Sequence, residues 1–416
     1  MVFEANAAEM QVISLIQKYR GEEYALLRLT FTMIDKNNLD ANDFFRSLLQ
    51  QWGLVDYDDL KHGGQYGVSY SSIFIHHGWS DEAVLKFYRV ANARGDRRFS
   101  LSTIKRRMND GQLHVGDLLY LSIYVKEDGQ PQIFIANLTN DTPSEQDIIN
   151  TVGLDAISSL MLDLRPKLAE ILSGRYYDNS KGPGALAPKD VGDTLEYILG
   201  IGTNNRDDAD LSGLIEVKSK GESRTLDTLF TLRPRFEDTR IALLVPNDKN
   251  RVKAFPRLYG YESPKHPGEL SLYITIGSSA HPQNNQGFYL DVDYENLTVN
   301  LIWKDPSTGE KEIAAFWLFD DLQQQLYQKH PATLWFKART RENGSTVQFC
   351  YTEIQFSRSP NFSTFLSLIE DGIITYDWRG HTPPAGGAGG KNHGNAWRIK
   401  PEYKSQLFGN IENITL

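Results

Sequence analysis

The chain has almost no cysteine, because Cys350 is the only one among 416 residues. An internal disulfide and a cysteine-rich zinc site are therefore excluded. The chain also lacks a long apolar run and an N-terminal segment that is first basic and then apolar. Neither membrane insertion nor secretion is indicated, so we expect a cytoplasmic protein that does not associate with membranes.

An excess of positive charge is missing as well, since the formal net charge is −9 at pH 7. This balance argues against indiscriminate binding of polyanions. It does not exclude a specific nucleic-acid site, because affinity for phosphates depends on where the cations are placed. The chain does contain 40% hydrophobic and 11% aromatic residues, enough for ordinary packed cores, and its 416 residues suit two domains.

The pattern with the most chemical information is Asp210-Leu-Ser-Gly-Leu-Ile-Glu216-Val-Lys218. Side chains alternate along a strand, so Glu216 and Lys218 project to the same side, and Asp210 can lean into the same space. Two carboxylates can hold Mg²⁺, and a lysine beside them can position or deprotonate a water for attack on a phosphodiester. The pattern predicts a metal-dependent nuclease, with an exposed, charged edge strand as the alternative.

The segments around this motif support the nuclease interpretation. Residues 182–200 read as a loop followed by a short helix that ends at Gly200. Glu196 lies on that helix and can offer a further carboxylate to the metal site. Residues 225–234 alternate as a strand does.

These features resemble the MvaI/BcnI family of restriction endonucleases, relatives of the mismatch-repair nickase MutH. The matching segments, which occur in the same order as in the family, are residues 194–199, 210–218, 226–231, 289–301, 315–326 and 393–399. The resemblance covers roughly residues 180–416 and implies an α/β, MutH-like PD-(D/E)xK nuclease fold.

The resemblance also implies roles for individual residues. Asp210 and Glu216 would bind Mg²⁺, Lys218 would orient the nucleophile, and Glu196 would assist at the metal. Asp208 could replace Asp210, because the spacing between these acids varies among the relatives. The implied reaction is hydrolysis of double-stranded DNA that leaves a 5′-phosphate, by a monomer that cuts the two strands in succession.

In this half of the chain, base recognition is expected from the C-terminal segment. Arg379 and Arg398 each suit guanine, through two hydrogen bonds in the major groove. His381 and His393 are expected to approach bases or phosphates, and the Gly-rich run at residues 386–390 could close over DNA. A zinc site is not expected, because no pair has metal-site spacing beside a cysteine; the histidines considered are His76, His77, His381 and His393.

The first half of the chain has a different pattern. Many strands and few helices predict a small β-barrel, and the expected strands are residues 24–34, 67–75, 83–90, 117–125 and 132–137. Residues 147–172 have helical spacing, and residues 173–188 are rich in Gly, Pro, Asn and Ser. We therefore expect a DNA-binding domain at 1–172, a linker at 173–182 and the nuclease domain at 183–416.

A local run of cations stands in this half, opposed within the run only by Asp96. Its eight members are Lys86, Arg89, Arg94, Arg97, Arg98, Lys105, Arg106 and Arg107. An arginine can donate to guanine while an aspartate accepts from cytosine, so the order Arg94-Gly-Asp96-Arg97-Arg98 could read a G·C pair. The remaining cations would hold phosphates. A solvated charged loop is the alternative.

Together with Gly63-Gly-Gln65-Tyr-Gly-Val-Ser-Tyr70, this run resembles the B3-like effector domain of EcoRII-type restriction enzymes. That domain is a pseudobarrel whose two arms grip the major groove. The resemblance places Gln65 and Tyr70 on one arm and Arg94, Asp96, Arg97 and Arg98 on the other. Gln65 stands where that family has histidine.

The two resemblances together imply a DNA target of the CCWGG type, five base pairs long, of which the first domain could bind the same or a second copy. A G/C-centred site stays open as the alternative. Two other functions are considered: a non-cleaving, sequence-specific DNA-binding regulator, and a MutH-like repair nickase recruited by a partner. The intact Asp210, Glu216 and Lys218 argue against the regulator, and a base-reading barrel makes recruitment less necessary.

Overall fold

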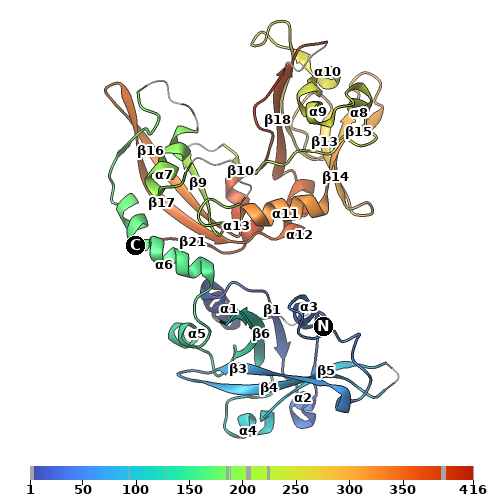
Figure 1. The fold of residues 1–416 in the computed structure, drawn as a ribbon, viewed down its shortest axis with the longest axis vertical. Helices are drawn as coiled ribbons and strands as arrows, with labels where there is room; N and C mark the ends of the chain where they lie inside the picture. The colour runs from blue at the N-terminus through green and yellow to red at the C-terminus, as the bar shows by residue number, and fades with distance from the viewer. Residues whose placement is uncertain are drawn as a thin grey trace. The chain divides into compact units, whose positions relative to one another are not determined.

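The computed structural model describes residues 4–92, 94–126, 128–183, 187, 189–202, 208–222, 225–385 and 390–415. The chain forms two compact units, Met1–Asp163 and Leu164–Leu416 (Figure 1). The division falls inside helix α6 (Ala156–Ile171). Among the described helices, none has both the length and the apolar composition to cross a membrane.

The first unit is built on one seven-stranded sheet of order β1-β6-β7-β3-β4-β5-β2. Its strands are β1 (Tyr24–Arg28), β2 (Leu39–Asp40), β3 (Val68–Ile75), β4 (Ser80–Arg89), β5 (Arg97–Leu101), β6 (Leu118–Val125) and β7 (Pro131–Asn137). The two ends of the sheet meet just after β2. There the side-chain amide of Asn42 donates to the backbone carbonyl of Leu26 on β1 at 2.8 Å. The sheet is therefore nearly closed, like a barrel.

The helices of this unit are more numerous than predicted: α1 (Ala7–Tyr19), α2 (Phe31–Lys36), α3 (Asp43–Gln51), α4 (Ile104–Asn109), α5 (Glu145–Val152), the beginning of α6 and the short 3₁₀ helix η1 (Gly64–Tyr66). The predicted strand at 24–34 is correct for residues 24–28 and wrong for the rest, where α2 begins at Phe31. It ends at Arg28, because the Thr30 hydroxyl accepts from the Met33 N–H and caps α2. The predicted helix at 147–172 is two helices, since Gly153, at φ 71°, ends α5.

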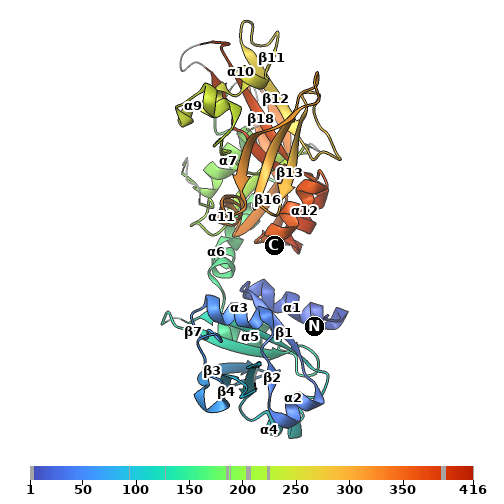
Figure 2. The same cartoon turned by 90° about the vertical axis from the view of Figure 1, so that its right-hand side faces the viewer.

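The second unit contains three sheets, of order β21-β17-β16-β9, β10-β20-β18-β12-β11 and β13-β14-β15. The strands are β8 (Tyr177–Asp178), β9 (Glu216–Gly221), β10 (Asp227–Phe230), β11 (Tyr261–Glu262), β12 (Leu270–Ile276), β13 (Phe288–Asp293), β14 (Thr298–Lys304), β15 (Lys311–Leu318), β16 (Ala332–Asn343), β17 (Thr346–Arg358), β18 (Ile374–Thr382), β19 (Lys391–Asn392), β20 (Ala396–Ile399) and β21 (Ile411–Asn413). Figure 2 shows β12, β13 and β18 alongside one another. β8, within the expected linker, pairs with β17.

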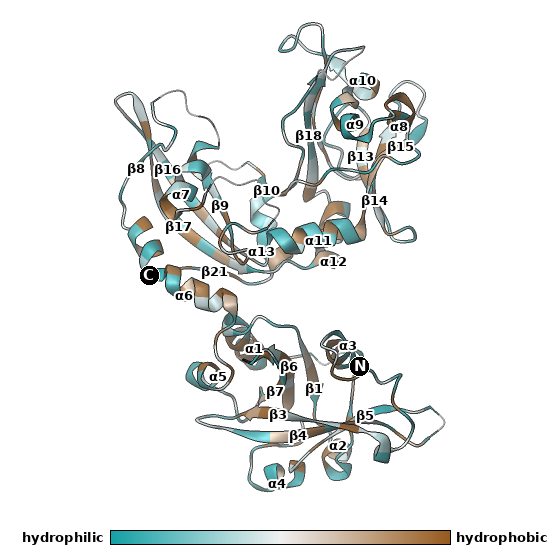
Figure 3. Ribbon diagram, in the orientation of Figure 1, coloured by the Kyte–Doolittle hydropathy of each residue, from teal (hydrophilic) through white to brown (hydrophobic). Residues whose placement is uncertain are grey.

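The helices of the second unit are the rest of α6, α7 (Asp190–Leu199), α8 (Arg240–Leu244), α9 (Asp248–Ala254), α10 (Pro256–Tyr259), α11 (Phe319–Lys329), α12 (Phe362–Glu370), α13 (Lys404–Phe408) and the short η2 (Pro401–Tyr403). Hydrophobic stretches recur along β17 (Figure 3). The core includes Trp317, Trp378 and Trp397, each at most 1% exposed. Because these tryptophans belong to β15, β18 and β20, the core packing fixes the last two strands, which carry Arg379 and Arg398.

Strand β9 lies at the edge of its sheet, pairs in parallel with β16, and is packed against α7. Helix α7 buries Leu195 completely, and its Val191 carbonyl accepts from the Tyr351 hydroxyl of β17 at 2.8 Å. These contacts hold the helix, and Glu196 with it, against the strand that begins at Glu216.

Candidate active site

The structure brings Asp210, Glu216 and Lys218 together at the start of β9. Glu216 is the first residue of the strand, and its side chain is only 2% exposed. Lys218 donates from Nζ to Oε1 of Glu216 at 2.5 Å. Asp210 precedes the strand, and its Oδ2 accepts from the N–H of Val217 at 2.9 Å, which ties this carboxylate to the strand.

Glu196 reaches the same group from α7. Its side chain is half-buried, and burial is the largest cause that raises the pKa of its carboxyl. The negative charges of Asp210 and Asp193 raise the pKa further, while Lys218 lowers it. Glu196 therefore lies within electrostatic reach of Asp210 and Lys218.

Asp208, the alternative to Asp210, faces a different environment. It is exposed, its Oδ1 accepts from the amide of Gln328 at 2.8 Å, and its carbonyl accepts from Lys329 at 3.2 Å. Asp208 is thus held toward α11, whereas Asp210 is held toward β9.

Glu216 has the electrostatics of a cation ligand. Burial raises the pKa of its carboxyl, Lys218 partly offsets this, and the charge of Asp210 raises it again. Its Oε2 is buried without a hydrogen-bond partner among the described residues, and the ammonium of Lys329 lies 3.9 Å from it. A buried carboxylate oxygen without a hydrogen bond, beside a second carboxylate, fits a hard divalent cation such as Mg²⁺.

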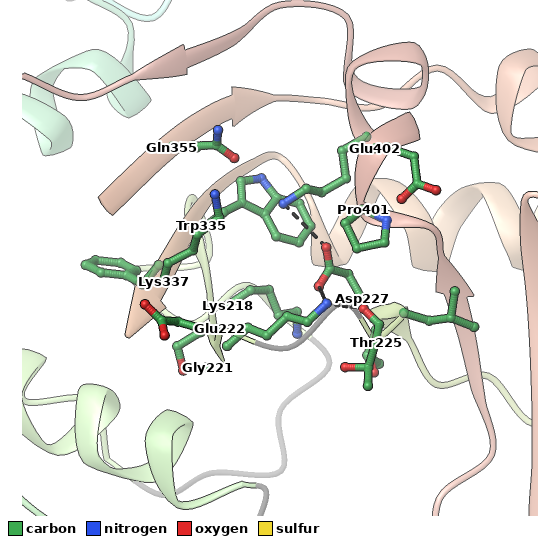
Figure 4. Close-up of a pocket in the computed structure, with 16 residues that line it drawn as sticks. Lys218, Gly221, Glu222, Thr225, Asp227, Trp335, Lys337, Gln355, Pro401 and Glu402 are labelled. Atoms are coloured by element: carbon green, nitrogen blue, oxygen red, sulfur yellow. Dashed lines mark hydrogen bonds and ion pairs between the residues drawn. The ribbon is translucent and has the colours of Figure 1, made fainter. Parts of the chain in front are cut away.

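A cavity of about 810 Å³ opens next to Lys218 (Figure 4). Asp227 lies in its wall, with Lys220 Nζ 3.0 Å and Lys404 Nζ 3.4 Å from its carboxylate. Lys404 also lies 4.3 Å from the ring centroid of Trp335, and burial lowers its pKa. Asp227 and Lys404 in this wall were not predicted from the sequence. Only Lys220 could have been found there, because it follows Lys218 by two residues and so shares its face.

His330 is a second feature that the sequence analysis missed. It is fully buried, its Nε2–H donates to the Leu229 carbonyl at 3.0 Å, and its Nδ1 accepts from the Thr333 hydroxyl at 2.8 Å. Burial, with the charge of Lys218, lowers the pKa of this imidazole to about 3. The ring is therefore neutral and joins α11, β10 and β16 without adding charge.

Arg379 and Arg398 converge on one buried acid. Asp377 on β18 is 2% exposed, and its Oδ2 lies 2.9 Å from Nη2 of Arg379 and 2.6 Å from Nε of Arg398. Its other oxygen accepts from the Thr275 hydroxyl at 2.7 Å. Both arginine side chains are 30% exposed. Asp377 therefore orients the two guanidinium groups, a role that the sequence analysis did not assign.

His381 and His393 lie beside each other, with ring centroids 5.6 Å apart. His381 is mostly buried and hydrogen-bonds through Nδ1 to Glu269, whereas His393 is exposed. The N–H of His393 donates to the Arg379 carbonyl at 2.8 Å. Residues 386–389 of the Gly-rich run expected to close over DNA lie outside the described residues.

In the first unit, Gln65 lies exposed on η1, while Tyr70 is half-buried on β3. The Tyr70 hydroxyl donates to the Leu54 carbonyl at 2.5 Å, and its ring centroid lies 6.2 Å from that of Phe87. The hydroxyl of Tyr70 is thus engaged inside its own unit.

The run of cations does not form a uniform patch. Arg94 is exposed, but Arg97 pairs with Asp58 at 2.5 Å, and Arg98 pairs with Asp40 at 3.1 Å. Asp96 lies 3.9 Å from Arg98. Acids distant in sequence therefore neutralise part of the run.

One member of the run has a structural role. Arg107 is fully buried and donates to both carboxylate oxygens of Asp81, at 2.8 and 2.7 Å. The expectation that every remaining cation holds phosphates is therefore wrong for Arg107.

Comparison with known proteins finds matches to the second unit. The model of the MvaI/BcnI restriction endonuclease family matches residues 167–408. The solved complex of the restriction endonuclease MvaI with its cognate DNA substrate superposes with a TM-score of 0.51 at 22% sequence identity, over 61% of this chain and 98% of that one. MvaI in the absence of DNA gives a TM-score of 0.36 at 21% identity, over 61% and 97% of the two chains. No curated protein matches the chain.

Proposed function

Because the chain belongs to the MvaI/BcnI restriction endonuclease family, we propose that it is a Type II enzyme that hydrolyses double-stranded DNA at a CCWGG-type site with Mg²⁺. The observation that carries this proposal is the group formed by Asp210, Glu216 and Lys218. Two carboxylates stand beside a lysine at the start of β9, and one of them has a buried oxygen without a hydrogen bond from any described residue.

Asp210 and Glu216 would hold Mg²⁺, and Glu196 would add a carboxylate from α7. Bound there, the ion supplies charge neutralisation at the phosphate and a lowered pKa for water. Lys218 orients the nucleophile, since its ammonium already lies on the carboxylate side of the strand. In-line attack of a water on the phosphorus would then break the bond to the 3′ oxygen, which releases the 3′-hydroxyl and leaves the 5′-phosphate.

Base recognition in this unit would rest on Arg379 and Arg398. Each can donate two hydrogen bonds to guanine, and their shared pairing with Asp377 limits the rotamers that they can adopt before DNA binds. His381 lies two residues beyond Arg379 on β18, and the N–H of His393 donates to the Arg379 carbonyl. Both histidines would approach the neighbouring bases or phosphates.

The first unit would be a B3-like DNA-binding domain. Its nearly closed sheet suits a pseudobarrel, and the exposure of Gln65 and Arg94 supports a role for them in DNA contact, together with Asp96, Arg97 and Arg98 in the same segment as Arg94. Tyr70 would act there through its ring or by holding its arm, because its hydroxyl is already bonded to Leu54. We propose that the protein works as a monomer and that this unit binds the same or a second copy of the site.

The test is digestion of a plasmid that carries one CCWGG site, with Mg²⁺, by three proteins: wild type, Lys218→Ala and Lys167→Ala. Lys167, a partly exposed residue of α6 that pairs with Glu170, serves as the matched control. Wild type and Lys167→Ala should cut at the site, and Lys218→Ala should cut about 10²–10⁴ times more slowly, the usual range for a proton-transfer or positioning group.

Other outcomes would overturn the proposal. Specific binding without cleavage by wild type would identify a DNA-binding regulator. Cleavage of a single strand, seen on denaturing gels with each strand labelled, would identify a MutH-like nickase. Cleavage of a G/C-centred site alone would correct the central base pair.

A further inference from the structure

A second group of metal-ligating side chains lies apart from Asp210 and Glu216. His266, Glu269 and His381 each place one ligand atom so that all three atoms lie within 4.8 Å of one another. His266 and Glu269 precede β12, and His381 belongs to β18. The β12–β18 register sets Ser271 opposite His381, which brings Glu269 to the histidine across 112 residues of sequence.

The group is partly sheltered and already organised. The side chain of His381 is 9% exposed and that of Glu269 is 29% exposed, and the two are joined by a hydrogen bond at Nδ1. The rings of His266 and His381 are stacked, with centroids 3.8 Å apart and planes 10° apart. The strand pairing thus brings Glu269 to His381, and the loop between β11 and β12 places the ring of His266 against that of His381.

We propose that His266, Glu269 and His381 bind a transition-metal ion of the Zn²⁺ class. Two imidazole nitrogens and one carboxylate oxygen are a ligand set that Zn²⁺ accepts, with a water in the fourth position. Mg²⁺ prefers oxygen ligands and does not favour such a set. One nitrogen lone pair of each imidazole must point at the ion, which two stacked rings do not allow. Metal binding therefore turns the His266 ring out of its stack on His381.

Such an ion would join the segment before β12 to β18, two residues beyond Arg379. The Zn²⁺ site does not depend on the proposed nuclease activity, because none of its ligands belongs to the group at β9. Its consequence for DNA does depend on the proposed function: a nitrogen of His381 that binds metal is withdrawn from DNA.

The test measures metal binding directly. Untagged, metal-free full-length protein is titrated with ZnCl₂ in a calorimeter, and Co²⁺ replaces Zn²⁺ in a parallel titration followed by its visible spectrum. Apart from any ion that the carboxylates at β9 take up, wild type should bind one equivalent of Zn²⁺ at this site. His266→Ala and Glu269→Gln should lose this equivalent or bind it more than about 10-fold more weakly, since changes around metal ligands alone cost that much. Circular dichroism in the absence of metal shows whether each variant is folded.

Two controls separate this site from others. His114→Ala removes an exposed histidine of the first unit, and Glu216→Gln removes a carboxylate of the proposed Mg²⁺ site. Both variants should still bind the equivalent of Zn²⁺ that His266→Ala loses. The proposal is overturned if folded His266→Ala binds Zn²⁺ as wild type does, if wild type binds none, or if Glu216→Gln is the variant that loses the ion. Cleavage plays no part in these readouts, so a failure here leaves the nuclease proposal to its own test.

Discussion

Glu216 lies in an environment that disfavours the ionised form of its carboxyl. A carboxylate at 2% exposure, next to a second carboxylate and with one oxygen that has no hydrogen bond among the described residues, loses more hydration than the ammonium groups of Lys218 and Lys329 restore. Its pKa is raised by burial and by Asp210 despite Lys218. The folded protein therefore binds this proton more tightly than the unfolded chain does, and ionisation of Glu216 lowers stability.

The pH dependence of stability should reveal this cost. The pKa of Glu216 is higher in the folded protein than in the unfolded chain. The loss of stability caused by its ionisation is therefore absent below the unfolded-state pKa, grows as the pH rises, and is complete above the folded-state pKa. We expect Glu216→Gln to raise the Tm of the metal-free protein at pH 8 and to change it little at pH 4. The measurement is thermal unfolding at both pH values, with cleavage assayed in parallel and expected to be lost.

Glu170→Gln is the matched control for this prediction. Glu170 is an exposed acid whose pKa is lowered by Lys167, so its replacement should leave the Tm at pH 8 unchanged or slightly reduced. A lower Tm for Glu216→Gln at pH 8 would show that the Lys218 pair outweighs the cost of burial.

At the scale of elements, β18 and β20 carry the two arginines that we propose for base recognition. Their pairing sets Asp377 opposite Ala396 and Thr375 opposite Arg398, so that arginines from two strands reach one carboxylate. The tryptophans Trp378 and Trp397 anchor the same strands in the core. Orientation of the arginines therefore belongs to the strand pair and not to either strand alone.

Removal of the shared acid tests this arrangement. Asp377→Asn should lower kcat/KM at a CCWGG site by about 10- to 100-fold, equivalent to about 1–3 kcal/mol for one guanine contact, while affinity for unrelated DNA stays the same. Cleavage kinetics and competition binding measure the two effects. The control is Asp371→Asn, an exposed residue just before β18. Equal losses on specific and unrelated DNA would argue that Asp377 stabilises the fold only.

At the scale of the whole molecule, a chain with net charge −9 must bind DNA through local groups of cations. Ion pairs with Asp40, Asp58 and Asp81 neutralise part of the run in the first unit. Exposed Arg94 remains a candidate for direct contact with DNA. The net charge repels DNA at low salt, so affinity should depend on few contacts, each with a measurable share of the salt dependence.

We expect Arg94→Ala to weaken DNA binding by the full chain. If Arg94 contacts a phosphate, the slope of log K against log salt falls by about 1 for all sequences; if it contacts guanine, discrimination falls by about 1–3 kcal/mol. Fluorescence anisotropy over a salt series, in the Lys218→Ala background to prevent cleavage, measures both. Lys126→Ala, at a lysine paired with Asp128, is the control. No change in slope or discrimination would remove Arg94 from the DNA interface.

Much of the nuclease unit could be predicted from the sequence alone, because its signals are local. Alternation along 216–221 places Glu216 and Lys218 on one face of a strand, the helix before it ends at Gly200 as predicted, and the family assignment is confirmed over residues 167–408. The segment at 24–34 shows the limit of local signals: its apolar run continues past Arg28, but a cap at Thr30 turns the chain into a helix.

Only the tertiary structure decided which distant side chains meet. Asp377 receives Arg398, Asp227 receives Lys404, and Glu269 reaches His381 because strand register brings them together. The same packing buries Arg107, which its sequence neighbours had marked as a surface cation. Periodicity and capping depend on residues a few positions apart, so the sequence determines them directly. Register between distant strands depends on the packing of the whole core, which no local pattern contains.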